Sequence, residues 1–387
     1  MDLKDKSKGI DKIRHDFLEG SFFSPVEQID YSQGVISTGA DTLDVALGGG
    51  WMRGHQHMIM GTYSSGKSAL TYSAIGRLLT FDPNAMACIV DIEGSVTPQW
   101  LEKFDGINFD YENPNNNRVW VSTPDTVENA VNSLCAIIEE GIFDFIVVDS
   151  LGAVARGVEI DGKNGKGGDA NAVQVAGSSV VITRMVNRVN AELTRIANKK
   201  RAGKDVVLPV VLYIGQARIN MKSLHGGLTI SGGEGLKHAC KTITEIRASG
   251  AADDTKYADI HGERIKVGNR VICKNRKNKL AEPYREAAYW FYFVETEDYP
   301  FGVDSADSLL TLAIGYKTIV QKGAWFYYGE EGQEGFVKAQ GRNKMLELLR
   351  DNPEFAQKVH EETMAIVIEE SENHLKNAKP GEGEYRE

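Results

Sequence analysis

Eight consecutive residues form the segment of this 387-residue chain with the clearest chemistry. The segment GTYSSGKS fits the pattern GxxxxGK(S/T), follows the apolar run HMIM and precedes a helical pattern. Glycines let backbone N–H groups surround phosphates, while the lysine reaches the terminal phosphates and the hydroxyl reaches Mg²⁺. A chance glycine-rich turn is the alternative, which the flanking strand and helix disfavour. The residues predicted to bind nucleotide are Gly61, Thr62, Tyr63, Ser64, Ser65, Gly66, Lys67 and Ser68.

Two acidic residues follow apolar runs elsewhere in the chain. Asp149 ends FIVVD and Glu93 follows CIVDI. Runs of this kind are typical of buried parallel strands, and ligands bind at the carboxyl ends of such strands. We therefore expect Asp149 to hold Mg²⁺ through water beside Ser68, and Glu93 to activate the water that attacks the γ-phosphate. Asp91 is the competing carboxylate, but strand alternation places it on the same side and deeper in the sheet.

Strands and helices alternate around these residues. Four short apolar runs, the last ending at Gln216, are separated by helical patterns. One pattern begins at Val127 and is closed by Gly141, and a longer one has an apolar stripe. The stripe consists of Ile182, Val186, Val189, Leu193 and Ile196. This alternation predicts an α/β fold with a mostly parallel sheet covered on both faces.

Composition divides the chain into four regions. Residues 1–35 are charged and are expected to form a helix set apart from the core, which spans residues 36–294. Residues 295–368 suggest a small α/β domain, and residues 369–387 a disordered polar tail. Two long glycine-rich stretches interrupt the core, and loops of that length are usually functional or disordered.

Composition also excludes several classes of protein. No apolar run approaches the roughly 18 residues that span a bilayer, and the first residues carry no apolar leader. We therefore expect no membrane association and a cytoplasmic location. The four cysteines are far apart and fit neither a disulfide framework nor a zinc site, so buried thiols are expected. A net charge of -10 requires any bound DNA to lie in a local basic groove.

An ordered series of motifs resembles bacterial RecA over nearly the whole chain. The motifs are ISTGADTLDVALGGG, GTYSSGKSALT, VDIEGSVTPQW, FIVVDSLGAV, VEIDG, YIGQAR, SGGEGLKHA, KNKLAEPY, QKGAWFYY and LRDNPE. No single block is decisive, whereas their order and approximate spacing are. The resemblance implies a RecA-like ATPase core, an N-terminal helix for filament assembly and a small C-terminal domain.

The resemblance also assigns catalytic roles. Glu93 matches the family's catalytic glutamate, and Gln216 matches the glutamine that senses the γ-phosphate at the start of the second DNA-binding loop. Lys277 and Lys279 match paired lysines that resemble a two-part arginine finger and reach the γ-phosphate of a neighbouring subunit. Seen alone, KNRKNK would be a solvated basic turn.

Adenine recognition is implied at two aromatic positions. Trp100 matches an aromatic residue that stacks on adenine, and Phe293 matches one supplied by the adjacent subunit. A tryptophan is otherwise usually a core residue. Thr97 stands where RecA has an aspartate that contacts the adenine amino group, so strict preference for ATP is in doubt.

The two glycine-rich stretches match the family's DNA-contacting loops. Backbone amides, glycines and a few cations suit a phosphate backbone bound without sequence preference. The second loop lacks the aromatic residue of RecA, and Leu224 is the nearest apolar candidate for wedging between bases. The predicted DNA-binding residues are Gly162, Lys163, Lys166, Arg218, Lys222, Leu224, Gly232 and Gly233. The basic insertion from Asn198 to Asp205 could contact duplex DNA or keep a lengthened turn soluble, and solubility is slightly favoured.

Taken with its motifs, the resemblance implies a strand-exchange recombinase with DNA-stimulated ATPase activity. Its cofactors would be ATP and Mg²⁺. Its partners would be single- and double-stranded DNA, copies of itself in a helical filament, and mediator or single-strand-binding proteins. A hexameric helicase on the same core and a DNA-binding scaffold with a degenerate ATP site are the alternatives. Departures in both DNA loops leave a phage-encoded source open.

Overall fold

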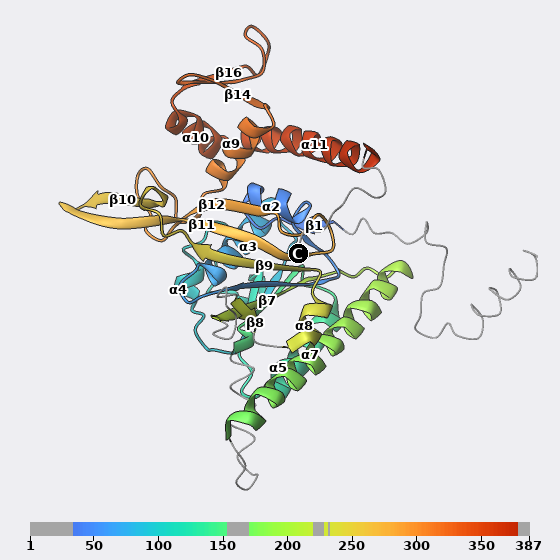
Figure 1. Cartoon of the computed structure of the whole chain (residues 1–387). Coiled ribbons are helices and arrows are strands. Elements are labelled where there is room, and N and C mark those ends of the chain that lie inside the picture. The colour runs from blue at the N-terminus through green and yellow to red at the C-terminus, as the bar shows by residue number, and fades with distance from the viewer. Residues whose placement is uncertain (1–33, 153–169, 220–227, 231–232, 378–387) are drawn as a thin grey trace, which may run out of the picture.

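The computed structural model describes residues 34–152, 170–219, 228–230 and 233–377. A central sheet carries helices on both faces, and a smaller C-terminal domain packs against one side of this core (Figure 1). Residues 1–33 of the predicted N-terminal unit and residues 378–387 of the predicted tail lie outside the described residues.

The central sheet has the strand order β13-β12-β11-β9-β3-β7-β6-β4-β5. Strands from β9 to β5 are parallel, and β11, β12 and β13 are antiparallel additions. The bounds are Gln56–Gly61 for β3, Ala87–Asp91 for β4, Val119–Ser122 for β5, Phe145–Asp149 for β6, Val210–Ile219 for β7, Thr242–Ala248 for β9, Glu263–Asn278 for β11, Glu286–Tyr292 for β12 and Gly302–Val303 for β13. β3, β4 and β6 are buried throughout, as expected of parallel strands covered on both faces. The predicted α/β fold is confirmed.

Short strands complete the core. β8 (Leu228–Ile230) pairs with β7, and β10 (Thr255–Ile260) pairs with β11 in a hairpin that projects beyond the sheet (Figure 1). β1 (Val35–Ile36) pairs with β2 (Trp51–Met52).

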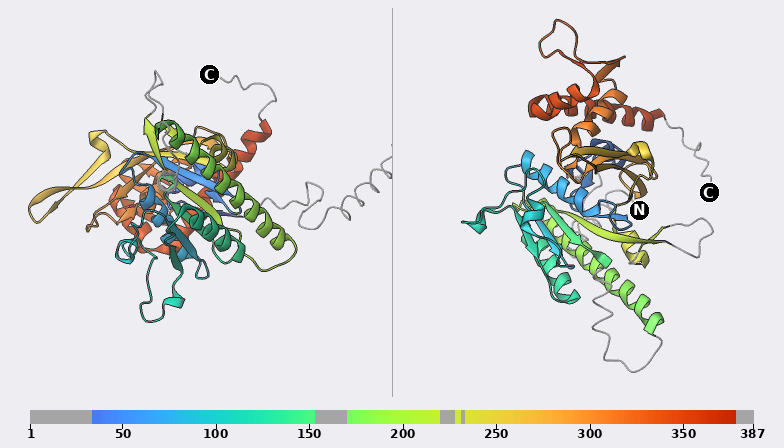
Figure 2. Two further views of the ribbon diagram at one scale, coloured as in Figure 1. Left: turned by 90° about the horizontal axis from the view of Figure 1, so that it is seen from below. Right: turned by 90° about the vertical axis from the view of Figure 1, so that its left-hand side faces the viewer.

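Helices cover the two faces because side chains of each strand alternate between them. Ile59 of β3 joins the apolar cluster that includes residues of α2 and α3, whereas Met58 and Met60 join the cluster that includes residues of α5 and α7. Figure 2 shows α3 on one side of the sheet and α5 and α7 on the other. The predicted stripe of the long helix is buried in that second cluster. The α-helices of the core are α2 (Asp41–Leu47), α3 (Lys67–Phe81), α4 (Pro98–Leu101), α5 (Val127–Glu140), α7 (Ala170–Arg201) and α8 (Gly233–Ala239), and 3-10 helices span Pro114–Asn116 and Ala252–Asp254.

Helix α5 shows how its sequence sets its ends. The Thr126 hydroxyl accepts a hydrogen bond from the backbone N–H of Asn129 at 3.1 Å, which caps the first turn. Gly141 has φ 65° at the other end, in the left-handed region that favours glycine. The predicted helix is therefore confirmed, with Gly141 as its stop.

The C-terminal domain has its own apolar core. Its elements are α9 (Ser305–Gly315), β14 (Ile319–Lys322), β15 (Trp325–Tyr328), β16 (Val337–Gln340), α10 (Arg342–Asp351) and α11 (Pro353–Asn377). The central sheet continues to β13, so the domain begins about ten residues after the expected boundary at 295. Residues 369–377 belong to α11, and the prediction of a disordered tail is wrong for them. They are polar, so they lack the apolar stripe that would mark a helix, and they continue a helix that is packed further upstream.

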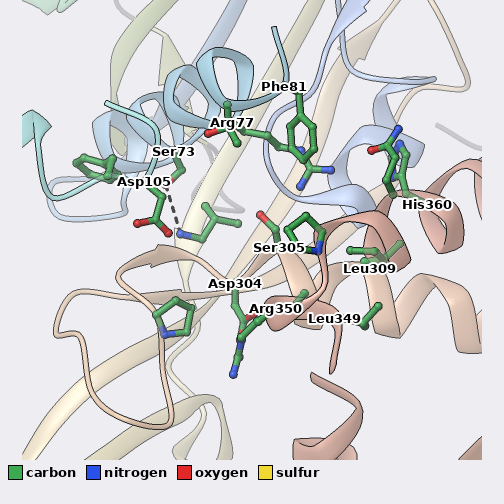
Figure 3. A pocket seen from close by; sticks show the side chains of 18 of the residues that line it. Ser73, Arg77, Phe81, Asp105, Asp304, Ser305, Leu309, Leu349, Arg350 and His360 are labelled. Carbon is green, nitrogen blue, oxygen red and sulfur yellow. Dashed lines mark hydrogen bonds and ion pairs between the residues drawn. The ribbon is translucent and has the colours of Figure 1, made fainter. Parts of the chain in front are cut away.

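A cleft of about 440 Å³ lies between the core and the C-terminal domain (Figure 3). Arg77 of α3 lines one side, and Arg350 and His360 line the other. Buried Asp41 pairs with both domains, at 3.5 Å from Arg77 and 2.7 Å from His360. Burial alone would raise the pKa of Asp41, but the charge of Arg77 and the hydrogen bond with His360 hold it below its ordinary value. Asp41 therefore links Arg77 of the core to His360 of the C-terminal domain.

Two further expectations concern membranes and cysteines. Across the described ranges, we find no helix with the length and apolar character needed to cross a bilayer. The four cysteines are buried free thiols, as expected.

Candidate active site

The predicted phosphate loop connects β3 to α3 at the edge where the parallel strands end. Gly61 has no room for a side chain, because a Cβ there would lie 2.3 Å from the carbonyl oxygen of Ile246. Gly66 has φ 87° at the start of α3, again in the region that favours glycine. The Ser65 hydroxyl is buried and donates to the Thr62 carbonyl at 2.9 Å. The loop has the strand–loop–helix context that the motif requires.

Lys67 folds back into this loop. Its Nζ donates to the carbonyl oxygens of Gly61 at 3.2 Å and Thr62 at 2.6 Å, and only 9% of the residue is exposed. Burial lowers the pKa of Lys67, against the opposing charges of Asp149 and Glu93. The ammonium group therefore lies at the mouth of the loop, where phosphate oxygens can replace the carbonyls.

Asp149, at the end of β6, lies beside the first turn of α3. The Ser68 hydroxyl donates to Asp149 Oδ2 at 2.9 Å, and the Tyr72 hydroxyl donates to the same oxygen at 3.3 Å. Burial raises the pKa of Asp149, while the hydrogen bond from Ser68 lowers it. Hydroxyl and carboxylate oxygens are the hard ligands that Mg²⁺ prefers, so this pair fits a magnesium site completed by phosphates and water. Sequence reasoning missed Tyr72, although its place four residues after Ser68 puts both on one helix face.

Glu93 and Asp91 differ sharply in their surroundings. Asp91 is buried and accepts three backbone N–H bonds, from Glu93 at 3.2 Å, Gly94 at 2.9 Å and Val96 at 2.8 Å. Glu93 lies in the exposed loop that these bonds shape, and its Oε1 accepts a hydrogen bond from Ser150 Oγ at 2.7 Å. Asp91 therefore anchors the loop, and Glu93 is the carboxylate available for chemistry. Asp91 and Ser150 are positioning residues that sequence reasoning did not assign.

Gln216 lies between the phosphate loop and the residues after Asp149. β7 pairs Gln216 with Gly61. A Cβ placed on Gly152 would lie 3.7 Å from the Gln216 carboxamide. The side chain therefore lies near the residues that follow Asp149, on the strand that leads into the second predicted DNA loop, and its role as a phosphate sensor stays a prediction.

Trp100 lies on α4 with 37% of its surface exposed. Its ring packs edge-on against Phe104 and Phe301, each with a centroid separation of 5.8 Å. Thr97 caps the helix, since its hydroxyl accepts from the Trp100 backbone N–H at 3.3 Å. The aromatic contacts fix the indole while part of it stays open to a stacking partner.

Comparison with known proteins identifies the family. Two protein-family models match: the RecA N-terminal domain over residues 4–296 and the RecA C-terminal domain over residues 307–367. Protein RecA of Thermus thermophilus is 31% identical over 367 residues, which cover 93% of this chain and 91% of the relative. The chain belongs to the RecA family. Protein RecA of Gloeobacter violaceus is 30% identical over 349 residues (90% and 82% of the two chains), and that of Thermus aquaticus is 29% identical over 388 residues (98% of both).

Family membership establishes the activity. The protein is a RecA recombinase and a DNA-dependent ATPase, which binds ATP and DNA and assembles with copies of itself. The alternatives of a ring helicase and of a scaffold with a degenerate site are therefore set aside.

The phosphate loop follows the carboxyl end of β3, whereas the RecA-type lysine pair lies at the other end of the strands. β11 pairs Lys277 with Ile243 of β9, which in turn pairs with Met58 of β3. Met58 precedes Gly61 by three residues, or about 10 Å of strand, and two strand spacings separate β11 from β3. Lys279 follows the end of β11, still farther from the loop. The sheet register therefore keeps both lysines away from the phosphate loop of their own chain.

The Lys277 side chain makes several hydrogen bonds at that end of the strands. Its Nζ donates to the carbonyl oxygens of Lys237, His238 (3.3 Å) and Cys240 (2.6 Å), at the C-terminal end of α8. Burial, reinforced by the charge of Lys279, lowers the pKa of Lys277. The lysine thus caps α8, whose last carbonyls have no donor within the helix.

Phe293 lies at the carboxyl ends of the parallel strands, the same end as the phosphate loop. It follows β12, which pairs Tyr292 with Gly268, and its backbone N–H donates to the Val267 carbonyl at 3.0 Å. The ring is 38% exposed. Phe293 and the lysine pair therefore lie at opposite ends of the strands within one chain. That the adjacent subunit supplies Phe293 stays a prediction.

Most predicted DNA contacts lie outside the described residues. These are Gly162, Lys163, Lys166, Lys222, Leu224 and Gly232. The backbone of Arg218 belongs to β7 and pairs with Thr229 of β8, and Gly233 begins α8. The second loop therefore leaves the sheet from the strand of Gln216 and returns at the helix that Lys277 caps.

The basic insertion is not a turn at its start. Asn198 to Arg201 form the last turn of α7, and Lys199 Nζ donates to the Glu139 carbonyl at 3.3 Å. Cations at a helix C-terminus are favoured by the helix dipole. This placement gives the insertion a structural role and corrects the expectation of a lengthened turn.

Proposed function

We propose that this recombinase hydrolyses ATP·Mg²⁺ at sites shared by adjacent protomers of a helical filament on single-stranded DNA. One protomer would contribute Lys67, Ser68 and Asp149, and its neighbour Lys277 and Lys279. The observation that supports this proposal is the placement of the lysines and the phosphate loop at opposite ends of the strands of one sheet. Protomers stacked head to tail would bring the two ends together.

The chain's own residues account for the chemistry as follows. Lys67 exchanges the Gly61 and Thr62 carbonyls for phosphate oxygens. Glu93, oriented by Ser150, accepts a proton from the attacking water. Ser68 and Asp149 would hold Mg²⁺, which would supply positive charge to the phosphates, and the neighbour's lysines would add the cations that stabilise the transition state.

Lys277 would couple DNA binding to ATP hydrolysis. In the single protomer this lysine caps α8, which directly follows the second predicted DNA loop. DNA that reorders the loop would shift α8 and release Lys277 towards the neighbouring γ-phosphate. Gln216, at the start of the same loop, would contact the γ-phosphate and so link the state of the nucleotide to the position of the loop. The proposal thus gives DNA-stimulated hydrolysis a physical basis.

Substrate contacts complete the proposal. Adenine would stack on Trp100, with Phe293 supplied by the adjacent subunit. Single-stranded DNA would lie along residues 162–168 and 218–233, and an incoming duplex would be recognised by base pairing. Mediator or single-strand-binding proteins would assist loading.

Mixed filaments test the shared site. Lys67→Ala removes the loop cation from one set of protomers, and Lys277→Ala with Lys279→Ala removes the finger from another. Each variant alone should lose DNA-stimulated ATPase activity. A mixture should regain part of it, because some junctions join an intact loop to intact lysines. Absence of recovery, with co-assembly on DNA verified by electron microscopy, would refute the shared site.

A further inference from the structure

We infer that Tyr72 is a positioning residue for the magnesium ligand Asp149. Its hydroxyl donates to Asp149 Oδ2 at 3.3 Å, the same oxygen that accepts from Ser68 at 2.9 Å. Tyr72 and Asp149 are 2% and 6% exposed, so water does not readily replace this contact. The inference rests on the proposed magnesium site.

The two hydroxyls differ in the role that metal binding gives them. Ser68 would become a ligand of Mg²⁺, so its oxygen would be shared between the metal and the carboxylate. The Tyr72 hydroxyl contacts Asp149 Oδ2 and would not be shared with the metal. Tyr72 is therefore the donor that would keep orienting the Asp149 carboxylate when Ser68 binds Mg²⁺.

Packing fixes the Tyr72 ring in turn. The ring lies edge-on to Phe104 at a centroid separation of 5.6 Å, and Phe104 lies edge-on to Trp100 at 5.8 Å. Edge-to-face pairs of this kind restrict both rings. A continuous chain of contacts thus runs from the proposed adenine-stacking residue to the proposed magnesium ligand.

Tyr72→Phe removes the hydroxyl and keeps the ring. We expect the Mg²⁺ concentration for half-maximal binding of a fluorescent ATP analogue to rise roughly tenfold, as for the loss of one hydrogen bond to a charged group. Binding of the same analogue in EDTA should not change, because the phosphate loop is untouched. Tyr213→Phe is the matched control, since it removes another buried hydroxyl, which donates to Gln56 Oε1 at 2.8 Å.

Phe104→Leu provides an independent test, because it keeps the hydroxyl but loosens the ring. It should raise the Mg²⁺ requirement by a smaller factor. The inference is overturned if Tyr72→Phe leaves the requirement unchanged, weakens binding equally in EDTA, or shifts it no more than Tyr213→Phe does. If Tyr72→Phe does not fold, an unchanged requirement in Phe104→Leu overturns it. A wild-type protein whose nucleotide binding ignores Mg²⁺ would instead refute the proposed metal site.

Discussion

Two carboxylates two residues apart, Asp91 and Glu93, have separate tasks. Strand alternation correctly placed Asp91 deeper than Glu93, and the structure adds that Asp91 is saturated by backbone donors. No sequence pattern reveals those bonds, because they depend on how the loop after β4 turns. The roles of Ser150 and Tyr72 could not be predicted for the same reason, because they depend on how strands and helices far apart in the sequence pack together.

Glu93→Gln should abolish most hydrolysis while nucleotide and DNA binding persist. The amide keeps the size of the side chain and its bond to Ser150 but cannot take a proton, so turnover should fall by about 10²–10⁴-fold. Filaments should also last longer after ATP is withdrawn. Steady-state ATPase assays and electron microscopy measure both effects, and near-normal turnover would exclude Glu93 as the base.

Asp91→Asn should act through stability instead. An asparagine has one acceptor oxygen where the aspartate uses two, so at least one backbone N–H loses its partner in a part-buried bond, at a cost of about 1 kcal/mol. We expect a lower free energy of unfolding in urea, where Glu93→Gln changes little. Equal stability of the two variants would contradict the division between anchor and base.

At the scale of elements, the sequence was informative where periodicity is strong. The apolar runs of β4 and β6 and the capped helix α5 appear as predicted, because burial on both faces and chain-end chemistry are local properties. The end of α11 and the basic end of α7 were missed, since both are polar helix turns that continue a packed helix. The opposite placement of Lys277 and the phosphate loop was also hidden, because it depends on the antiparallel register of β11.

Lys277 should stabilise α8 in addition to any role in hydrolysis. Lys277→Ala removes the donor to three carbonyl groups, so amide hydrogen exchange in residues 236–240 should become faster. Lys279→Ala is the matched control, because Lys279 is exposed and the structure gives it no such bonds to α8. Both variants should lose DNA-stimulated ATPase activity. Equal exchange in the two would show that Lys277 does not cap the helix.

At the scale of the whole molecule, Asp41 links Arg77 of the core to His360 of the C-terminal domain, and we expect this contact to help hold the domain on the core. Asp41→Asn removes the negative charge that faces these two side chains. We expect a loss of about 2 kcal/mol, less than for a fully buried pair because both partners are partly exposed. Thermal unfolding should show a lower Tm or a separate transition of the C-terminal domain.

Glu347→Gln is the control for the Asp41 variant. It breaks the Lys344–Glu347 pair at 2.5 Å within the C-terminal domain, where the two side chains are 61% and 52% exposed. Surface pairs contribute about 0–1 kcal/mol, so its Tm should change little. An equal decrease in Tm for the control would show that the contact between the domains stabilises the protein no more than a surface pair does.

Placement of the lysines and the phosphate loop at opposite ends of the strands would also make the proposed head-to-tail filament polar. One terminal protomer would always carry a phosphate loop without finger lysines, and the other would always carry lysines without a loop to serve. An assembly of n protomers would then hold n−1 complete sites, and turnover per protomer would rise with length. Short oligomers would be poor ATPases, and the end that displays the bare loop would hold its nucleotide longest before hydrolysis. Addition and loss of protomers at the two ends would therefore proceed at different rates.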